Sequence, residues 1–87
     1  MVESRQKWVD FDGDTFNVDA ALIADGLGIS PAMVQPLMRE QKITSRCERG
    51  IRRDAGRYRL TFWHDDRRLR LVVDRTGEIL QRIADTE

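Results

Sequence analysis

The fold is decided by the stretch Arg57-Tyr58-Arg59-Leu60-Thr61-Phe62-Trp63-His64-Asp65-Asp66-Arg67-Arg68-Leu69-Arg70-Leu71-Val72-Val73-Asp74. If Asp65-Asp66 is a two-residue turn, apolar side chains of the two flanking strands face one another, and arginines share the other side. This register pairs His64 with Arg67, Trp63 with Arg68, Phe62 with Leu69, Thr61 with Arg70, Leu60 with Leu71, Arg59 with Val72, Tyr58 with Val73 and Arg57 with Asp74. A slip of one residue would place apolar side chains opposite arginines. The sequence therefore predicts an antiparallel hairpin with a fixed register.

Two segments beside this hairpin extend the sheet. From Ile43 to Glu48 small or apolar residues alternate with polar ones, which predicts a strand with one solvent-facing side that carries Arg46. A loop is expected from Gly50 to Gly56. At 78–84 the apolar residues allow either a last strand or a short helix. The meander therefore has three to four strands.

The N-terminal half begins with a second, shorter hairpin. Residues 8–11 and 15–18 alternate around Asp12-Gly13, a dipeptide that closes tight turns. Asp19 then stands at the N-cap position of a short helix. Gly26 and Gly28 are expected to end that helix.

Ser30-Pro31 supplies a second helix start, and this helix is expected to run to about Gln41. The whole chain is thus expected to be α+β, with an N-terminal β-hairpin, two short helices and an antiparallel β-meander. The helices would pack on one face of the sheet. With 87 residues, the chain is expected to form a single domain over 1–87.

The composition predicts a protein of the cytoplasm. Cys47 is the one cysteine, so no intramolecular disulfide can form, and a reducing compartment fits. The polar N-terminus is not followed by an apolar run of signal-peptide or membrane-span length. We therefore expect no membrane partner.

Charge is distributed unevenly along the chain, although the formal net charge is zero. Residues 1–38 hold two basic against six acidic side chains, whereas residues 39–75 hold twelve basic against six acidic ones. Such asymmetry is typical of proteins with an anionic partner. It also suits pairing between the acidic and basic parts of one molecule or of two copies.

The residues for enzyme chemistry or metal binding are missing. Asp10, Asp12 and Asp14 resemble the start of a calcium loop, but the glycine is misplaced and Ala21 occupies the twelfth position, which requires glutamate. Cys47 and His64 lie on different predicted strands, and Cys47 is expected to be a small inward-facing core residue. We therefore predict no enzyme, no cofactor and no metal.

The segment 20–40 resembles a helix-turn-helix. Ala24, Gly28 and Val34 match the small residue, the turn glycine and the branched residue of that motif. The resemblance implies that the second helix would present Gln35 and Arg39 outward as the residues able to reach DNA bases. The neighbouring outward residues are two prolines and an alanine, whose side chains offer no hydrogen bonds to base edges. Residues 19–41 also carry a net negative charge, which disfavours binding to DNA.

The chain as a whole resembles an uncharacterised bacterial family of small proteins. The resemblance is carried by the run Ile43-Thr44-Ser45-Arg46-Cys47-Glu48-Arg49-Gly50, followed by Asp54 to Phe62 and Leu69 to Asp74. It spans nearly the whole chain. Because that family has no established activity, the resemblance supports the extent of the domain and implies no chemistry.

The solvent-facing side of the sheet is the remaining candidate for function. We name it the arginine face, and it comprises Arg46, Arg57, Arg59, Trp63, Arg68 and Arg70. Arginines around an exposed aromatic ring can grip an acidic protein or stack on bases, and they are also common on solvated sheets. We expect non-enzymatic binding of an acidic protein surface or of a second copy. The alternative is a nucleic-acid-binding regulator that uses either this face or the helix pair.

Overall fold

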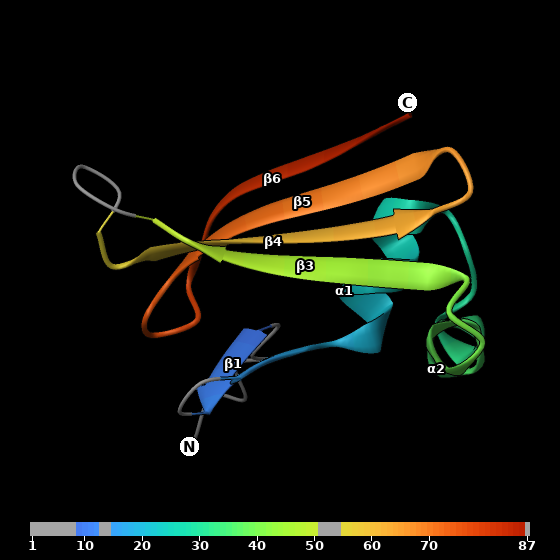
Figure 1. Ribbon diagram of the computed structural model, residues 1–87, viewed down its shortest axis with the longest axis horizontal. Helices are drawn as coiled ribbons and strands as arrows, with labels where there is room; N and C mark the ends of the chain where they lie inside the picture. The colour runs from blue at the N-terminus through green and yellow to red at the C-terminus, as the bar shows by residue number, and fades with distance from the viewer. Residues whose placement is uncertain (1–8, 13–14, 51–54, 87) are drawn as a thin grey trace, which may run out of the picture.

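The computed structural model describes residues 9–12, 15–50 and 55–86. Its elements are β1 (Val9–Asp12), β2 (Thr15–Val18), α1 (Ala20–Leu27), α2 (Pro31–Arg39), β3 (Ile43–Arg49), β4 (Arg57–His64), β5 (Arg67–Asp74) and β6 (Ile79–Thr86). The strands form a two-stranded sheet, β1-β2, and a four-stranded antiparallel sheet in the order β3-β4-β5-β6 (Figure 1). The expected α+β fold is confirmed, and its meander has four strands.

The central hairpin has the register that its alternation predicts. All eight expected pairs between β4 and β5 are present, from His64 opposite Arg67 to Arg57 opposite Asp74. Asp65 in the turn has a φ of 53°, a left-handed conformation that aspartate tolerates. The segment left open at 78–84 is a strand, because Ile79–Thr86 pairs with β5.

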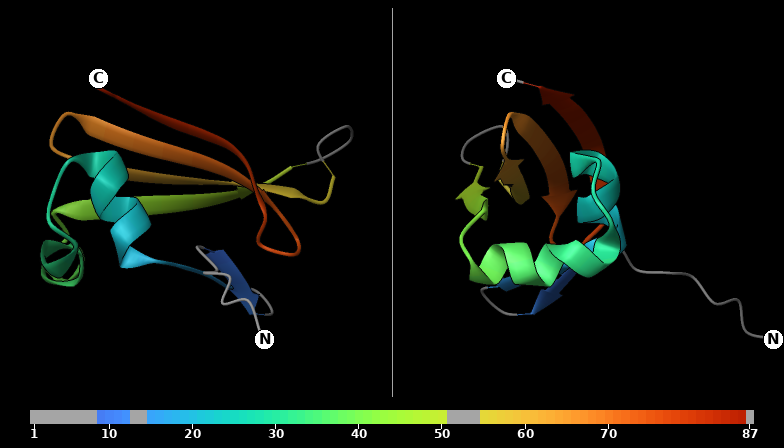
Figure 2. Two further views of the ribbon diagram at one scale, coloured as in Figure 1. Left: turned by 180° about the vertical axis from the view of Figure 1, so that it is seen from behind. Right: turned by 90° about the vertical axis from the view of Figure 1, so that its right-hand side faces the viewer.

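Both helices and the β1-β2 hairpin lie on one side of the four-stranded sheet (Figure 2). The core forms between these layers, since α1 packs on β4 and β5 while α2 reaches β3. Its buried residues are Val9, Leu22, Ile23, Ala24, Leu27, Val34, Ile43, Leu60, Phe62, Leu69, Leu71 and Val73. Burying the apolar side of the central hairpin turns its arginines toward the open side of the sheet.

The first helix begins after the Asp19 cap, as predicted, and it ends at Gly28 and not at Gly26. Asp19 Oδ1 accepts a hydrogen bond of 2.8 Å from the Ala21 amide, and Gly28 ends the helix with a φ of 73°. Gly26 was expected to help end the helix, but it lies inside α1 and is buried. A Cβ there would stand 2.6 Å from Cδ1 of Leu69, so glycine permits close packing of helix on sheet.

The second helix ends at Arg39, two residues earlier than expected. Gln41 has a φ of 61°, and the Lys42 amide donates a 2.8 Å hydrogen bond to the Leu37 carbonyl. With the 3.0 Å bond from the Gln41 amide to Met38, this is a Schellman ending in which glutamine takes the position usually held by glycine.

Parts of three predictions fall outside the described residues. These are Trp8 in the first strand, Gly13 in the first turn, and residues 51–54 of the loop. Across the described part of the chain, no single helix is long and apolar enough to cross a membrane; α1 and α2 meet that test only as a pair bent by 91°.

The contact between Gly26 and Leu69 gives a test of the helix-sheet packing. We expect Gly26→Ala to lower the free energy of unfolding by about 1–3 kcal/mol, because the new methyl group would lie 2.6–2.8 Å from three atoms of the fully buried Leu69 side chain. Urea denaturation followed by circular dichroism measures this change. In a Leu69→Ala background the same substitution should be neutral or stabilising, since the methyl group then fills a cavity. Equal destabilisation in both backgrounds would contradict this account.

Candidate functional site

The six predicted residues of the arginine face lie on the outward side of three neighbouring strands. Arg46 is on β3, Arg57, Arg59 and Trp63 are on β4, and Arg68 and Arg70 are on β5. The registers align them in rows across the sheet. One row is Thr44, Trp63, Arg68 and Asp85; the next is Arg46, Thr61, Arg70 and Ile83; the third is Glu48, Arg59, Val72 and Gln81.

Two carboxylates that the sequence analysis did not place on this face neutralise part of it. Glu48 Oε1 accepts a 2.9 Å hydrogen bond from Arg59 Nε. Asp85 on β6 receives two hydrogen bonds from Arg68, at 3.0 and 2.8 Å, in a bidentate ion pair. The arginine hydrogen bonds hold the pKa of each carboxyl group below its ordinary value. The first and the third of these rows therefore each contain one arginine–carboxylate ion pair.

The signal for Glu48 was present in the sequence, because it shares the parity of Arg46 on β3. Asp85 could not be placed, because the segment at 78–84 was compatible with a helix as well as a strand. Once β6 is known to pair with β5, Asp85 falls opposite Arg68. Arg68 therefore lies between Trp63 on β4 and Asp85 on β6, and its guanidinium group hydrogen-bonds to Asp85.

The middle row has a different character, because it holds two arginines and no carboxylate. Thr61 lies between Arg46 and Arg70 and is only 2% exposed, so larger neighbours cover its small side chain. Nε of Arg70 is buried and has no hydrogen-bond partner within the described residues. The centre of the face thus holds a guanidinium group whose hydrogen-bonding capacity is not filled.

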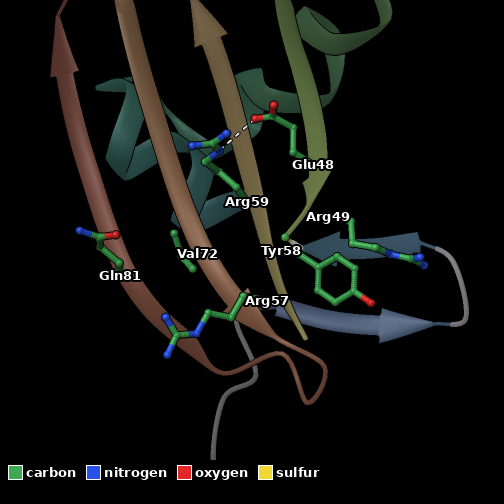
Figure 3. Close-up of a pocket in the computed structure, with 8 residues that line it drawn as sticks. Glu48, Arg49, Arg57, Tyr58, Arg59, Val72 and Gln81 are labelled. Atoms are coloured by element: carbon green, nitrogen blue, oxygen red, sulfur yellow. Dashed lines mark hydrogen bonds and ion pairs between the residues drawn. The ribbon is translucent and has the colours of Figure 1, made fainter. Parts of the chain in front are cut away.

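A shallow hollow of about 280 Å³ lies beside this centre (Figure 3). Val72 stands between Arg59 and Gln81 in the third row, and Arg57 extends along the sheet below it. The hollow therefore has Val72 at its floor and three guanidinium groups around it, those of Arg49, Arg57 and Arg59. Gln81, Tyr58 and Glu48 complete its lining, and the Glu48 carboxylate is already hydrogen-bonded to Arg59. Such a lining suits a carboxylate that carries a short apolar stem.

Asp74 lies opposite Arg57 as predicted, yet its carboxylate also organises the next turn. Asp74 Oδ1 accepts hydrogen bonds from the Thr76 hydroxyl at 2.6 Å, the Thr76 amide at 2.9 Å and the Glu78 amide at 3.1 Å. The Thr76 hydroxyl and these amides lower the pKa of Asp74. The Asp74 carboxylate therefore stabilises the turn between β5 and β6.

The predicted helix residues, Gln35 and Arg39, are both exposed on α2. They belong to α2, which lies on one side of the sheet (Figure 2), whereas the strand registers direct most of the arginine face to the other side. The two candidate surfaces meet at the β3 edge, where Gln35 and Arg46 line the same groove.

The prediction that Cys47 is a core residue is wrong. Cys47 faces the helix side, opposite Leu60 in the register, but it is exposed. The reason is its place on the edge strand, where it lines an open groove of about 460 Å³ between β3, α2 and β2. Alternation along a strand identifies the side to which a residue points and does not show whether another layer covers it.

None of the described residues lowers the pKa of the Cys47 thiol, as activation would require. His64 pairs with Ile43, four residues along β3 from Cys47, which corresponds to about 13 Å along the strand. His64 Nδ1 donates instead to the Lys42 carbonyl at 2.9 Å. Partial desolvation and the nearby Glu48 carboxylate raise the pKa of Cys47. Over residues 9–12, 15–50 and 55–86, no three His, Cys, Asp or Glu side chains cluster as a metal site would require.

The raised pKa of Cys47 predicts a slow, strongly pH-dependent alkylation. A raised pKa leaves less thiolate at neutral pH, and the thiolate is the reactive species. The rate of reaction with iodoacetamide should therefore inflect at a higher pH in the folded protein than in urea, where desolvation and the fixed Glu48 charge are lost. Mass spectrometry at timed intervals gives both profiles. A native inflection at lower pH than the unfolded one would indicate an activated thiol and contradict this assignment.

Comparison with known proteins places these features in a family. Neither the curated proteins nor the solved structures give a match to the chain. A family model described as a family of unknown function, DUF6522, matches residues 4–86. This match covers almost the whole chain, including every described strand and helix. The chain therefore belongs to the DUF6522 family of unknown function.

Proposed function

We propose that this protein is a non-enzymatic binding domain of the cytoplasm whose arginine face engages acidic side chains of a partner protein. The observation that carries this proposal is the middle row of the sheet. Arg46 and Arg70 flank the buried Thr61, and neither forms an ion pair with a carboxylate in the described part of the chain. Glu48 and Asp85 hydrogen-bond to Arg59 and Arg68 and act on Arg46 and Arg70 only through space, so the arginines without a hydrogen-bonded counter-charge are those at the centre.

The buried Nε of Arg70 supports an acceptor supplied from outside. A buried donor without an acceptor costs about 1–3 kcal/mol, so a turn of the Arg70 guanidinium toward solvent, where Nε meets a partner carboxylate over Thr61, would recover that cost. The same carboxylate would lie within reach of Arg46 on the other side. A second acidic side chain could occupy the hollow above Val72, between Arg57 and Arg59.

The mixed charge of the face favours a protein over a nucleic acid. Glu48 and Asp85 lie among the arginines and would repel a continuous phosphate backbone. A protein surface can place basic groups near these two carboxylates and acidic groups near Arg46 and Arg70.

Nucleic-acid binding is the second candidate, and the helix pair favours it. The 91° bend between α1 and α2, across a three-residue turn, is in the range of helix-turn-helix units, and Gln35 and Arg39 are exposed on the second helix. Such binding would use the side of the molecule that bears the helices. Substitution of Arg70, which does not line the groove beside α2, would leave it unchanged, so the two candidates separate by mutation.

The proposal predicts binding of a fluorescent poly-glutamate peptide that is lost when the central row is neutralised. We expect Arg46→Gln/Arg70→Gln to weaken binding about tenfold or more, which corresponds to about 1.4 kcal/mol, and raised salt to weaken wild-type binding. Fluorescence anisotropy measures the affinities. The matched control is Arg39→Gln/Arg75→Gln, which removes the same charge from exposed positions outside the face.

Equal losses in the two double variants would show that net charge alone drives binding, and would overturn the proposal. A random oligonucleotide pool tested in parallel identifies the second candidate. Nucleic-acid binding by the helix pair would be weakened by Gln35→Ala or Arg39→Gln and unaffected by Arg70→Gln, which lies outside the groove that Gln35 lines. Thermal denaturation of each variant confirms that it is folded.

A further inference from the structure

The two edges of the four-stranded sheet are built differently. At β6 the pairing with β5 shifts, since Val72 is opposite Gln81 while Val73 is opposite Ile79, and Leu80 is left without a cross-strand partner. Arg82 of β6 is also tied to α1 through an ion pair with Asp25. Bulges and charged attachments of this kind protect an edge strand from pairing with another chain.

The opposite edge, β3, has no such irregularity. Seven consecutive residues, Ile43–Arg49, pair with β4 without a shift. Thr44, Ser45, Arg46 and Cys47 are all exposed, and no described strand pairs with the outer side of β3. This edge is therefore open to strand addition, by which a further strand extends a sheet through backbone hydrogen bonds.

The hydrogen bonds of β3 determine which of its residues can pair outward. The Gly50 amide donates a 2.8 Å hydrogen bond to the carbonyl of Arg57, the residue opposite it in the register. Hydrogen-bonded pairs alternate along an antiparallel ladder, so the even-numbered residues of β3 direct their backbone groups to β4. Ile43, Ser45, Cys47 and Arg49 consequently direct their amides and carbonyls to the open side.

The side chains of β3 then select a single register for pairing with itself. Two copies related by a two-fold axis must bring odd-numbered residues opposite one another to form hydrogen bonds. With Arg46 or Glu48 on the axis, like charges would meet, which is destabilising. With Ser45 on the axis the strands overlap less, and Arg46 faces the neutral Thr44. With Cys47 on the axis, Arg46 faces Glu48 of the second copy, and this complementary pair occurs twice.

We propose that β3 pairs antiparallel with β3 of a second copy, with Cys47 on the two-fold axis, so that two four-stranded sheets join into one. Glu48 can accept from Arg46 of the second copy while keeping Arg59, because a carboxylate has two oxygens. On the helix side, Arg49 of the second copy lies opposite Ser45, and its aliphatic stem covers the mouth of the groove that Ser45 lines. Both arginine faces lie on the same side of the joined sheet.

The Arg46–Glu48 pairs allow a test of this dimer with two charge-reversal variants, first measured separately and then as a mixture. Sedimentation equilibrium from about 10 µM to about 1 mM should give a wild-type mass that approaches twice 10.1 kDa. Arg46→Glu and Glu48→Arg should each remain monomeric, because each places like charges opposite one another at two positions. An equimolar mixture of the two variants should dimerise, since every cross-strand pair is then complementary. Circular dichroism checks that both variants are folded.

A wild-type monomer at the highest concentration would overturn the proposal, as would a wild-type dimer that the single reversals leave intact. A mixture that stays monomeric while each variant is folded would overturn the register. Copper-phenanthroline gives a second measurement of the register, because it should oxidise the two facing Cys47 thiols to a disulfide, with two protons released and two electrons passed to copper(II). Residues in a hydrogen-bonded pair have Cα atoms about 5.5 Å apart, within disulfide range. A wild-type dimer that forms no Cys47 cross-link would also overturn the register.

The same variants separate this dimer from the proposed binding function. Glu48→Arg retains every arginine of the arginine face, so it should lose the dimer and still bind poly-glutamate. The dimer engages Arg46 with Glu48 of the second copy, and the variant releases it, so binding should be no weaker than in the wild type. Loss of the dimer with binding intact would show that binding does not require the dimer.

Discussion

The alternation of side chains along β4 and β5 is the constraint on which the rest of the structure depends. Tyr58, Leu60 and Phe62 on one strand and Leu69, Leu71 and Val73 on the other can be buried together in one register only. Helices and the first hairpin then cover that side, because the apolar surface must be removed from water. The arginines between these residues have no alternative to the opposite side. Core formation and the arginine face are thus two results of one pattern.

Sequence reasoning was most successful where this pattern is continuous. It gave every pair between β4 and β5, the cap at Asp19 and the outward position of Gln35 and Arg39. It was wrong in predicting a buried Cys47 and in placing Gly26 at the end of the helix. The residues around each of them, such as Leu69 beside Gly26, are distant in the chain. The alternation of a strand predicts the side of the sheet to which a side chain points. Whether that side chain is buried depends on whether a helix lies over it, and this depends on where the helices end.

The electrostatics of the candidate site could be predicted only in part for the same reason. The arginines lie on the strands with the clearest alternation, but the carboxylates that neutralise them come from the two edge strands. Asp85 joins the face through β6, whose conformation the sequence left open, and its bidentate contact with Arg68 follows from that pairing. The middle row around Thr61 has no carboxylate of its own, and its arginines interact with Glu48 and Asp85 only through space. This arrangement is visible only when all four strands are aligned.

The order of strands in the sheet, β3-β4-β5-β6, is also their order along the chain, and this has a consequence for how the protein folds. Every strand pair of the sheet closes through a turn or short loop, so its contacts are local in sequence and the entropy lost in forming them is small. Contacts of α1 with β4, β5 and β6 span a much longer stretch of chain. The meander can therefore form early as a sheet with one exposed apolar side, and docking of the N-terminal half is the step that completes the core. During synthesis from the N-terminus, α1 and the first hairpin emerge before the surface that they cover, and they acquire their buried environment only after β5 is available.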